Sequence, residues 1–430
     1  MLNRRTVAVS VGILGLGTVG SGVAQILLSP EGRSPLLRGV KIAKVGVRDR
    51  LKPRPVALPP DSYTDDLESI VTDPAIDVVI EVMGGLEPAR SLILKAIAHK
   101  KSVITANKAV LARFGDEIFT LAKAHGVYVM LEAAVAGGIP VIQTLKQGLG
   151  ANRLSEVIGI INGTTNYILT QMQERGESFA QALATAQALG YAEADPTADV
   201  DGLDAADKIA ILASLAFGDR IRLQDIYCEG IRSITTTDIK YAQELGYTIK
   251  LLGIAKSTEI GIDVRVHPAL IPSHSSLANV HGVTNAIKIV GDPLGEIVLS
   301  GPGAGSGPTA SAVVADLLNL IATKGGVFNP LMGCLHDGYA KITPIANLQT
   351  QYYLRAIARD VPGVIGEIGA LLGRQGVSIR TILQKDIHSN LADIVIMTKT
   401  VREGQFQEVV DEMRHLPEIA SVPTVIRVVN

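Results

Sequence analysis

A short acidic segment ends in a lysine at a spacing that suits proton transfer. Residues 191–208 contain six carboxylates and Lys208. A helix that starts after Gly202 would place Asp204 and Lys208 one turn apart on the same face. A lysine oriented by an aspartate in a partly dry cleft can give a proton to a carbonyl oxygen while hydride reaches the carbon. The same spacing is also common in exposed ion pairs on surface helices.

Other polar residues could bind the substrate. The remaining carboxylates of residues 191–208 would suit a substrate that carries an ammonium group. The run Asn162-Gly163-Thr164 follows an apolar stretch, and it could hydrogen-bond a substrate carboxylate or cap the next helix. Lys108 follows a strand expected over residues 102–105. Ligands of open α/β sheets lie outside the carboxyl ends of the strands, so Lys108 would face a cofactor cleft unless it is an ordinary solvated lysine.

A glycine-rich run predicts a dinucleotide site, because it follows one expected strand and opens a helix. Glycines there permit a tight turn and let the backbone approach a pyrophosphate at the helix N-terminus. The residues of this run are Gly15, Leu16, Gly17, Thr18, Val19 and Gly20. The second strand ends at Arg48, Asp49 and Arg50. These arginines, with Lys52 and Arg54 nearby, favour the 2′-phosphate of NADP, whereas Asp49 keeps NAD open. The alternative is that the charges only form a solvated strand end.

A carboxylate and a glycine turn follow the last strand of the first region. Glu132 begins this segment, which runs through Gly137 to Pro140. It could present backbone carbonyls to a hard cation. A segment of this kind is more often only a turn.

The elements that must position these residues form several regions. Residues 1–131 alternate β-rich runs with helical periods, which is typical of a parallel sheet built from βαβ units. Strands are expected over 7–14, 42–47, 77–83, 102–105 and 127–131. Residues 132–308 mix strands with long helices over 179–189 and 203–217, and they predict an α+β domain. A helix that starts at Thr309 could return to the first domain, which would then include residues 309–330.

The C-terminal part has a pattern of its own. Residues 331–350 contain few periodic apolar positions and are interpreted as a linker. Residues 351–430 predict strands over 352–358, 377–384, 392–398 and 422–429, with helices over 363–374 and 406–415. The order βαββαβ is typical of a ferredoxin-like domain.

Composition bounds the class of protein. The chain has 430 residues, 47% of them hydrophobic and 19% charged, with a net charge of −2. These values predict globular domains, and they argue against nucleic acid, whose partners usually carry a basic excess. No long apolar run indicates a membrane span. Two cysteines, Cys228 and Cys334, and a start without an export signal favour the reducing cytoplasm.

These motifs together resemble homoserine dehydrogenase in its long form with a C-terminal ACT domain. The matching segments are GLGTVG at 15–20, EVMGG at 81–85, TANKA at 105–109, EAAVAGGIP at 132–140, GIINGTTNYIL at 159–169, LGYAEADPTADVDGLDAADK at 189–208 and GPGAG at 301–305. The resemblance implies a Rossmann-type dinucleotide domain, a substrate and dimerisation domain and an ACT domain. It also implies interconversion of L-homoserine and L-aspartate 4-semialdehyde with NADP or NAD, in the biosynthesis of threonine, methionine and isoleucine.

The resemblance implies roles for individual residues. Lys208 would transfer the proton, Asp204 would orient it, and Lys108 would be a second cationic group at the reacting oxygen. Glu193 and Asp199 would hold the substrate. The cofactor would also be approached by Gly84, Gly303 and Gly305. A monovalent cation, usually sodium, would lie near Glu132 and the carbonyls of Val135, Gly137 and Ile139.

The ACT resemblance implies regulation by L-threonine as a feedback inhibitor. The loop that joins the first strand and helix would border the ligand through Asp360, Pro362, Gly363 and Val364. The alternative is a dimerisation domain without a ligand, because a fold does not fix a function. A homodimer or homotetramer is expected, since ACT modules commonly pair and most soluble oligomers are symmetric.

Two rival functions remain open to the residues alone. A phosphorylating semialdehyde dehydrogenase would need a cysteine nucleophile beside a base. Cys228 has acidic neighbours that oppose a thiolate, and Cys334 lies near the linker. An inactive amino-acid sensor would use the first domain only to bind nucleotide, and the intact Lys108, Asp204 and Lys208 argue against it.

Overall fold

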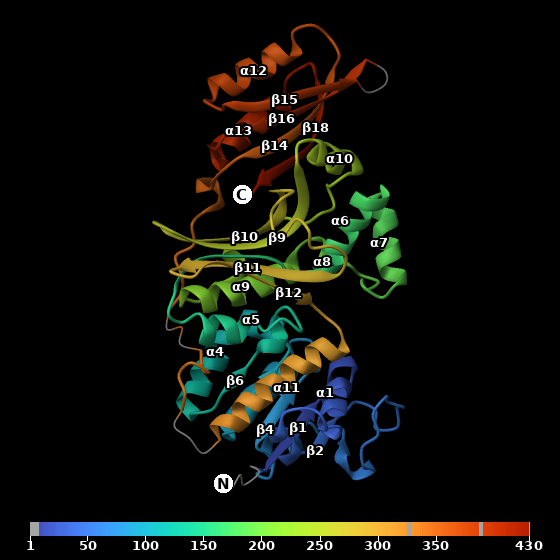
Figure 1. Cartoon of the computed structure of the whole chain (residues 1–430), viewed down its shortest axis with the longest axis vertical. Coiled ribbons are helices and arrows are strands. Elements are labelled where there is room, and N and C mark those ends of the chain that lie inside the picture. The colour runs from blue at the N-terminus through green and yellow to red at the C-terminus, as the bar shows by residue number, and fades with distance from the viewer. Residues whose placement is uncertain (1–7, 325–327, 335, 337, 387–389, 430) are drawn as a thin grey trace. The chain divides into compact units, whose positions relative to one another are not determined.

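The protein was analysed as a computed structural model that describes residues 8–324, 328–334, 336, 338–386 and 390–429. The chain forms two compact units, each assembled from three stretches. Unit 1 consists of Met1–Leu154, Ala210–Leu223 and Val290–Tyr339, and unit 2 consists of Ser155–Ile209, Gln224–Ile289 and Ala340–Asn430. Figure 1 labels elements of both units where there is room.

Unit 1 contains a parallel sheet with the strand order β3-β2-β1-β4-β5-β6. Its strands are β1 (Val9–Leu14), β2 (Val40–Gly46), β3 (Tyr63–Thr64), β4 (Val78–Glu81), β5 (Ser102–Thr105) and β6 (Val129–Met130). The inner strands are continuous apolar runs, as expected where helices cover both faces. The predicted parallel sheet is confirmed, and the two-residue strand β3 was not predicted.

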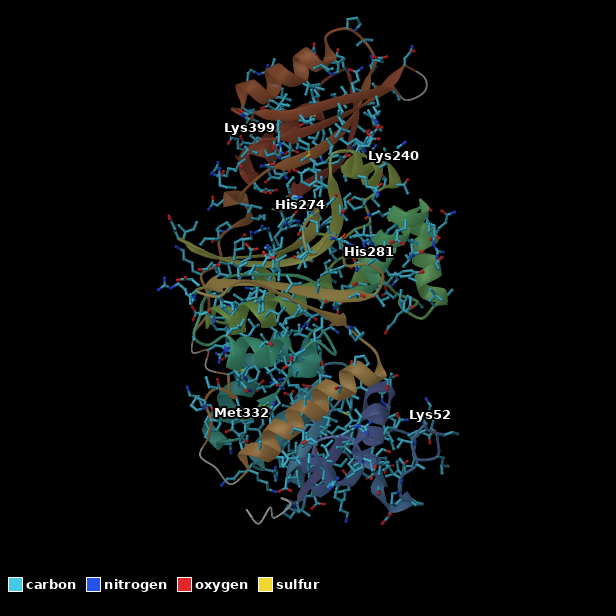
Figure 2. All side chains as sticks on the ribbon, in the orientation of Figure 1. Lys52, Lys240, His274, His281, Met332 and Lys399 are labelled. Atoms are coloured by element: carbon cyan, nitrogen blue, oxygen red, sulfur yellow. The ribbon has the colours of Figure 1, made fainter. Side chains whose placement is uncertain are left out.

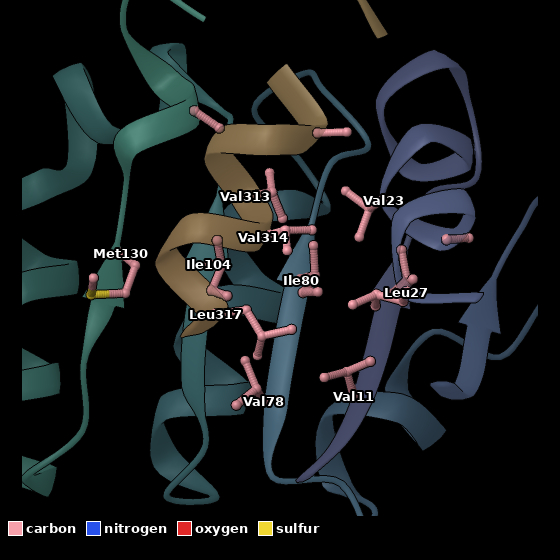
Figure 3. Packing of buried hydrophobic residues seen from close by; sticks show 14 of the residues in the cluster. Val11, Val23, Leu27, Val78, Ile80, Ile104, Met130, Val313, Val314 and Leu317 are labelled. Carbon is pink, nitrogen blue, oxygen red and sulfur yellow. The ribbon is translucent and has the colours of Figure 1, made fainter. Parts of the chain in front are cut away.

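The sheet is covered by the helices that connect its strands and by one helix from later in the chain. They are α1 (Thr18–Leu28), α2 (Glu68–Thr72), α3 (Ala89–Ala98), α4 (Lys108–His125) and α11 (Ser306–Thr323). The short helix α5 (Val141–Gln143) belongs to the same unit. Val23 and Leu27 of α1 pack with Val313 and Leu317 of α11 over Ile80 of β4 (Figure 3). The helix expected from Thr309 therefore does return to this sheet. It starts three residues earlier, because Pro308 is tolerated in a first helical turn.

Helices α1 and α11 approach each other closely. A Cβ atom at Gly22 would lie 2.8 Å from the Ser306 Oγ and 3.0 Å from the Ala310 Cβ. The Ser306 hydroxyl donates to the carbonyl of Thr18 at 2.7 Å. This contact ties the beginning of α11 to the beginning of α1, where the dinucleotide site is expected.

Unit 2 contains a mixed, mostly antiparallel sheet with the order β11-β7-β9-β10-β18-β14-β16-β15, and β8 pairs with β10. The strands are β7 (Arg153–Ile160), β8 (Tyr227–Cys228), β9 (Tyr247–Thr258), β10 (Gly261–Pro272), β11 (Thr284–Asp292), β14 (Tyr352–Arg359), β15 (Ile379–Asp386), β16 (Leu391–Thr398) and β18 (Ile419–Val428). Strand β12 (Gly295–Pro302) precedes α11.

The C-terminal domain has the predicted βαββαβ order, formed by β14, α12 (Val364–Arg374), β15, β16, α13 (Glu403–Met413) and β18. Its core includes Tyr352 and Phe406, whose rings stack at 4.1 Å. The domain is not a separate body, however. Strand β18 pairs in parallel with β10 at Ala269 and Leu270, so its edge is used to extend the neighbouring sheet.

The stretch expected to be a linker is partly structured. Strand β13 (Gln349–Thr350) pairs with β17 (Val401–Arg402). The backbone of Ile262 exchanges hydrogen bonds with Lys341 and Thr343, each at 2.8 Å. Residues 335 and 337 of this stretch lie outside the described part of the chain.

The helices of unit 2 include α6 (Gly163–Arg175), α7 (Phe179–Ala188), α8 (Thr197–Val200) and α10 (Thr236–Glu244), and α9 (Leu203–Phe217) begins there. Helix α9 has the predicted bounds, and α7 ends one residue earlier than predicted. Among the described residues, no helix combines the length and the apolar character that a bilayer crossing requires.

Candidate active site

A cavity of about 900 Å³ lies where β1 and β2 end and α1 begins. The predicted cofactor residues that line it are Gly15, Leu16, Gly17, Thr18, Arg48 and Gly84. Other lining residues were not predicted as cofactor contacts, among them Gln25, Pro88 and Ser306. Sequence reasoning missed Ser306, because it lies in the glycine-rich run that precedes the helix predicted from Thr309.

The three glycines of the first turn serve different purposes. Gly15 has φ +98°, and a Cβ there would lie 3.0 Å from the Val82 carbonyl oxygen. A Cβ at Gly20 would lie 2.1 Å from the Gly15 carbonyl oxygen, so Gly20 lets α1 pack on its own turn. At Gly17 the space is open. The backbone there is therefore free for close approach by a pyrophosphate at the helix N-terminus.

The far rim of this cavity is basic. Arg48, Lys52 and Arg54 line it together with Asp49, and Lys52 lies on the loop after β2 (Figure 2). The Asp49 carboxylate accepts the backbone N–H of Leu51 at 2.8 Å. The lining therefore offers several cations to an anionic group. It also contains a second carboxylate, Asp65, and Arg54 is bonded to the carbonyls of Lys52 and Asp49.

Six predicted cofactor residues do not line this cavity: Val19, Gly20, Arg50, Lys108, Gly303 and Gly305. Arg50 is exposed. Gly303 packs instead against the turn after Glu132, because a Cβ at Gly137 would lie 2.5 Å from its carbonyl oxygen. Gly305 caps α11 with φ +117°.

Lys108 is the first residue of α4 and is positioned by a buried chain of hydrogen bonds. Thr105 donates its hydroxyl to the fully buried Glu81 at 2.6 Å, and it accepts the backbone N–H of Asn107 at 3.0 Å. Asn107 caps α4 by accepting the N–H of Val110 at 3.2 Å. Burial raises the pKa of the Glu81 carboxyl. Sequence reasoning missed the part played by Glu81 and Asn107.

The acidic segment and the polar run meet in unit 2. The Asn162 amide donates to Asp199 at 2.7 Å and to Asp204 at 2.9 Å. The Lys208 ammonium donates to Asp204 at 2.6 Å and to the Ile161 carbonyl at 2.7 Å. The side chains of Lys208 and Asp204 are only 12% and 11% exposed. The exposed surface pair that the spacing also allowed is therefore excluded.

Asn162 serves both purposes that the sequence left open. Its Oδ1 atom caps α6 by accepting the N–H of Thr165 at 2.8 Å, and its Nδ2 atom faces the carboxylates. Thr164 donates its hydroxyl to the Tyr191 carbonyl at 2.7 Å, which ties α6 to the acidic segment. Gly202, with φ +83°, makes the sharp turn that brings α9 back toward the same cluster.

The charges of this cluster are uneven. Burial raises the pKa of Asp199, and the neighbouring Asp204 carboxylate adds to this, while the Asn162 amide opposes it. Glu193 is exposed, and its carbonyl accepts from the side chain of Gln187 at 3.0 Å. The cluster can hold a cation and a proton donor within one small volume, which suits an amino acid that reacts at an oxygen.

The Glu132 turn is buried and tightly folded. Glu132 accepts the N–H groups of Ile142 and Gln143 at 2.9 and 2.7 Å, and its own N–H donates to Asp316 at 2.8 Å. Burial raises the pKa of Glu132 and of Asp316 to about 7. The described residues include no cluster of three or more His, Cys, Asp or Glu side chains fit for a metal. A cation at this turn would depend on main-chain carbonyls.

Neither cysteine has the environment of a nucleophile. Burial, followed by Asp201 and Glu229, raises the pKa of Cys228 to about 11. Burial also raises the pKa of Cys334. Thiolate chemistry is therefore disfavoured at both positions, which argues against a phosphorylating semialdehyde dehydrogenase.

A second cavity, of about 360 Å³, opens in the C-terminal domain at the loop between β14 and α12. Asp360, Pro362, Gly363 and Val364 all line it, and these are the residues for which a regulatory role is expected. Gln384 reaches across and donates to Asp360 at 3.1 Å. The cavity has less than half the volume of the dinucleotide cavity.

A dinucleotide cradle on a parallel sheet and a buried lysine among carboxylates define a dinucleotide-dependent oxidoreductase with an added C-terminal domain. Comparison with protein families supports this class. Residues 15–132 match the NAD binding domain of homoserine dehydrogenase, residues 140–318 match the homoserine dehydrogenase family, and residues 352–418 match the ACT domain.

Two relatives match almost the whole length of the chain, and a third matches about three quarters of it. A homoserine dehydrogenase of Synechocystis sp. is 53% identical over 98% of this chain and 100% of its own. A crystal structure of a homoserine dehydrogenase from Thiobacillus denitrificans covers 98% of both chains, with 42% identity and a TM-score of 0.89. A hyperthermophilic archaeal homoserine dehydrogenase in complex with NADPH is 25% identical over 74% of this chain and 99% of its own, with a TM-score of 0.61. The chain belongs to the homoserine dehydrogenase family.

Proposed function

We propose that the chain interconverts L-homoserine and L-aspartate 4-semialdehyde with Lys208 as the proton-transferring group. The observation that carries this assignment is the buried pair of Lys208 and Asp204 at 2.6 Å. A dinucleotide, when bound, would supply or accept the hydride. In the reducing direction the Lys208 ammonium gives its proton to the carbonyl oxygen that becomes the alcohol, and Asp204 keeps its Nζ atom in place.

The substrate's own charges would be met by the same cluster. Asp199, together with Glu193, would hold the substrate ammonium, and Asn162, Gly163 and Thr164 would border it. The Asn162 amide lies between two carboxylates and reduces their mutual repulsion. Lys108 would add a second positive charge at the reacting oxygen, supported by its place at the N-terminus of α4 beyond β5.

NADP is the preferred cofactor in this proposal. Arg48, Lys52 and Arg54 line the dinucleotide cavity, where they suit a 2′-phosphate. The archaeal relative in complex with NADPH points the same way.

L-threonine is the proposed inhibitor, bound in the cavity of the ACT domain. The loop of Asp360, Pro362, Gly363 and Val364 would surround it, and the Asp360 carboxylate would meet its ammonium. We further propose that the enzyme serves threonine, methionine and isoleucine biosynthesis, in the cytoplasm, as a homodimer or homotetramer.

A sodium ion is the remaining proposal. It would lie at the turn after Glu132, held by the carbonyls of Val135, Gly137 and Ile139. The left-handed backbone of Ala136 and Gly137, with φ +59° and +53°, supports a turn that redirects carbonyl groups.

Initial-rate kinetics test these proposals together. Homoserine oxidation is measured with NADP and with NAD, with and without threonine, in sodium and in potassium buffers. We expect a lower KM for NADP, inhibition by threonine and a higher rate in sodium. Equal KM values, full activity in excess threonine, or equal rates in both buffers would each remove the corresponding assignment.

A further inference from the structure

Arg427, near the end of β18, joins the ACT domain to residues 155–209 and 224–289 of unit 2, which we call the substrate half. Its guanidinium is 3% exposed and forms a two-point bond with Glu403 of α13, with N···O distances of 2.8 and 2.7 Å. The remaining Nη1 atom donates to Glu229 at 2.8 Å. Glu229 follows β8 and belongs to the substrate half. One arginine therefore holds a carboxylate on each side of the domain boundary.

The contact at Glu229 is fixed by further bonds. The Tyr227 hydroxyl donates to Glu229 at 2.9 Å, and the Arg427 guanidinium lies 4.7 Å above the Tyr227 ring. The backbone N–H of Glu229 donates to Val266 at 2.8 Å, which continues the pairing of β8 with β10. Such a fork of planar donors has little freedom to reorient.

The residues on either side of Glu229 hold the backbone of the acidic segment in place through hydrogen bonds and close packing. Ile231 donates its N–H to the Val200 carbonyl at 2.8 Å. The Cys228 thiol donates to the Asp201 carbonyl at 3.3 Å. A Cβ at Gly230 would lie 2.1 Å from the Val200 carbonyl oxygen, so only glycine allows this approach.

The acidic segment held in this way carries the carboxylates of the candidate site. Asp199 precedes Val200 directly, and Asp204 follows the Gly202 turn. Both accept from Asn162, at 2.7 and 2.9 Å. A shift of this segment by a few tenths of an ångström would lengthen these bonds and displace the Asp199 carboxylate.

We propose that the Arg427–Glu229 bond is a positioning contact, through which the ACT domain sets the place of Asp199 and hence the affinity for homoserine. The inference rests on the proposed role of Asp199 in holding the substrate ammonium. Coupling between two binding sites is reciprocal. If a ligand that moves β18 changes the affinity for homoserine by some factor, homoserine changes the affinity for that ligand by the same factor.

The test uses the full-length enzyme with Glu229→Gln, which preserves side-chain volume and leaves Arg427 paired with Glu403. We expect the KM for homoserine to rise about five- to tenfold, because the charge-assisted bond from Arg427 is replaced by a weaker bond to a neutral amide oxygen. The kcat should change less than about twofold and the KM for NADP should stay constant, because neither the proton donor nor the dinucleotide cavity is altered. Arg427→Lys keeps the charge but loses the fork, so it should give a smaller rise.

The matched control is Glu244→Gln. Glu244 of α10 also pairs across the same boundary, with Lys385 of β15 at 2.5 Å, but this pair is exposed and lies on a different element. It should leave the KM for homoserine unchanged. A KM for homoserine that is the same in Glu229→Gln, Glu244→Gln and the wild type would overturn the inference. The inference would also be overturned if Glu229→Gln lowered kcat and the melting temperature and raised the KM values for homoserine and NADP together. Such a result would show only a structural role.

Failure of the proposed function would look different. Asp199→Asn is measured alongside. If Asp199→Asn also left the KM for homoserine unchanged, the assignment of Asp199 would fall and the inference with it. If Asp199→Asn raised that KM and Glu229→Gln did not, only the positioning inference would fall.

Discussion

The side-chain amide of Asn162 donates to the carboxylate of Asp204 at 2.9 Å, on the same oxygen atom that accepts from Lys208. This single oxygen therefore joins the N-terminus of α6 to the lysine of α9. The orientation of the lysine depends on an asparagine that lies 46 positions earlier in the chain.

Replacing Asn162 by alanine should damage catalysis more than folding. The variant loses two hydrogen bonds to carboxylates, each worth about 1.5–3 kcal/mol, and a helix cap worth about 1 kcal/mol. We expect kcat/KM for homoserine to fall at least about tenfold in steady-state assays. The control is Ser178→Ala, which removes the capping box of α7. It should lower the melting temperature without changing kcat/KM, and an equal effect of both variants on kcat/KM would contradict the account.

Replacing Arg48 by alanine should weaken the binding of NADP but not that of NAD. The arginine lines the dinucleotide cavity, where it would pair with a 2′-phosphate. Its loss should raise the KM for NADP about tenfold or more and leave the KM for NAD nearly constant, as for one charged hydrogen bond. Arg50→Ala is the matched control, because Arg50 lies two residues further along and outside the lining. Similar changes for both cofactors in Arg48→Ala would remove the assignment.

Threonine sensitivity should depend on Asp360. The variant Asp360→Asn keeps the shape of the cavity and removes the charge that would meet the ligand ammonium. The threonine concentration for half-inhibition should rise about tenfold while uninhibited activity stays constant. Arg414→Gln, which breaks an exposed ion pair with Asp411 in the same domain, serves as the control. Unchanged inhibition of Asp360→Asn would place the ligand elsewhere.

Deletion of residues 351–430 is a poor test of the same point. It would remove β18 from the edge of β10 and take Arg355 away from the fully buried Asp238, to which it donates at 2.7 Å. A buried carboxylate left without its partner costs about 3–5 kcal/mol. Loss of activity on deletion would then report unfolding, so point variants in the cavity are the better choice.

A buried lysine should make stability depend on pH. Lys250 is 1% exposed and donates to the Val280 carbonyl and to Asn166, at 2.6 and 3.0 Å. Burial lowers its pKa from 10.5 to about 8. Between these two values the unfolded chain binds more protons than the folded one. The contribution of Lys250 to the free energy of unfolding must therefore rise with pH in that window.

Urea unfolding of the wild type and Lys250→Met tests this. Between pH 7 and pH 9.5, the wild type should gain on the order of 2 kcal/mol relative to the variant. The exposed Lys95, which pairs with Glu68, provides the control variant Lys95→Met. A wild-type advantage that stayed constant over this range would show that burial does not lower the pKa of Lys250.

Local signals in the sequence predict much of the fold. Helix α9 and strand β5 have the expected bounds, because a glycine turn or an apolar run limits them directly. The two-residue strands β3, β8, β13 and β17 were not predicted, since their pairing depends on distant neighbours rather than on their own residues. The pairing of β10 with β18 was not predicted for the same reason, because the sequence of an edge strand does not indicate which strand it pairs with.

The candidate site shows the same division. The spacing of Asp204 and Lys208 predicts their ion pair, but not that both are buried. Of the basic residues after β2, the sequence favoured Arg48 and Arg50 as cofactor contacts, whereas the folded loop brings Arg48, Lys52 and Arg54 to the cavity. No helical or strand period orders the side chains of an irregular loop, so only the structure separates these residues.

The central claim is that the Lys208 ammonium transfers the proton. The most direct measurement is the steady-state kcat of Lys208→Met for homoserine oxidation with NADP, with cofactor binding measured in parallel. General acid–base catalysis contributes about 10²–10⁴-fold, so kcat should fall by that factor while the Kd for NADP stays constant. Wild-type turnover in a folded Lys208→Met enzyme would contradict the account.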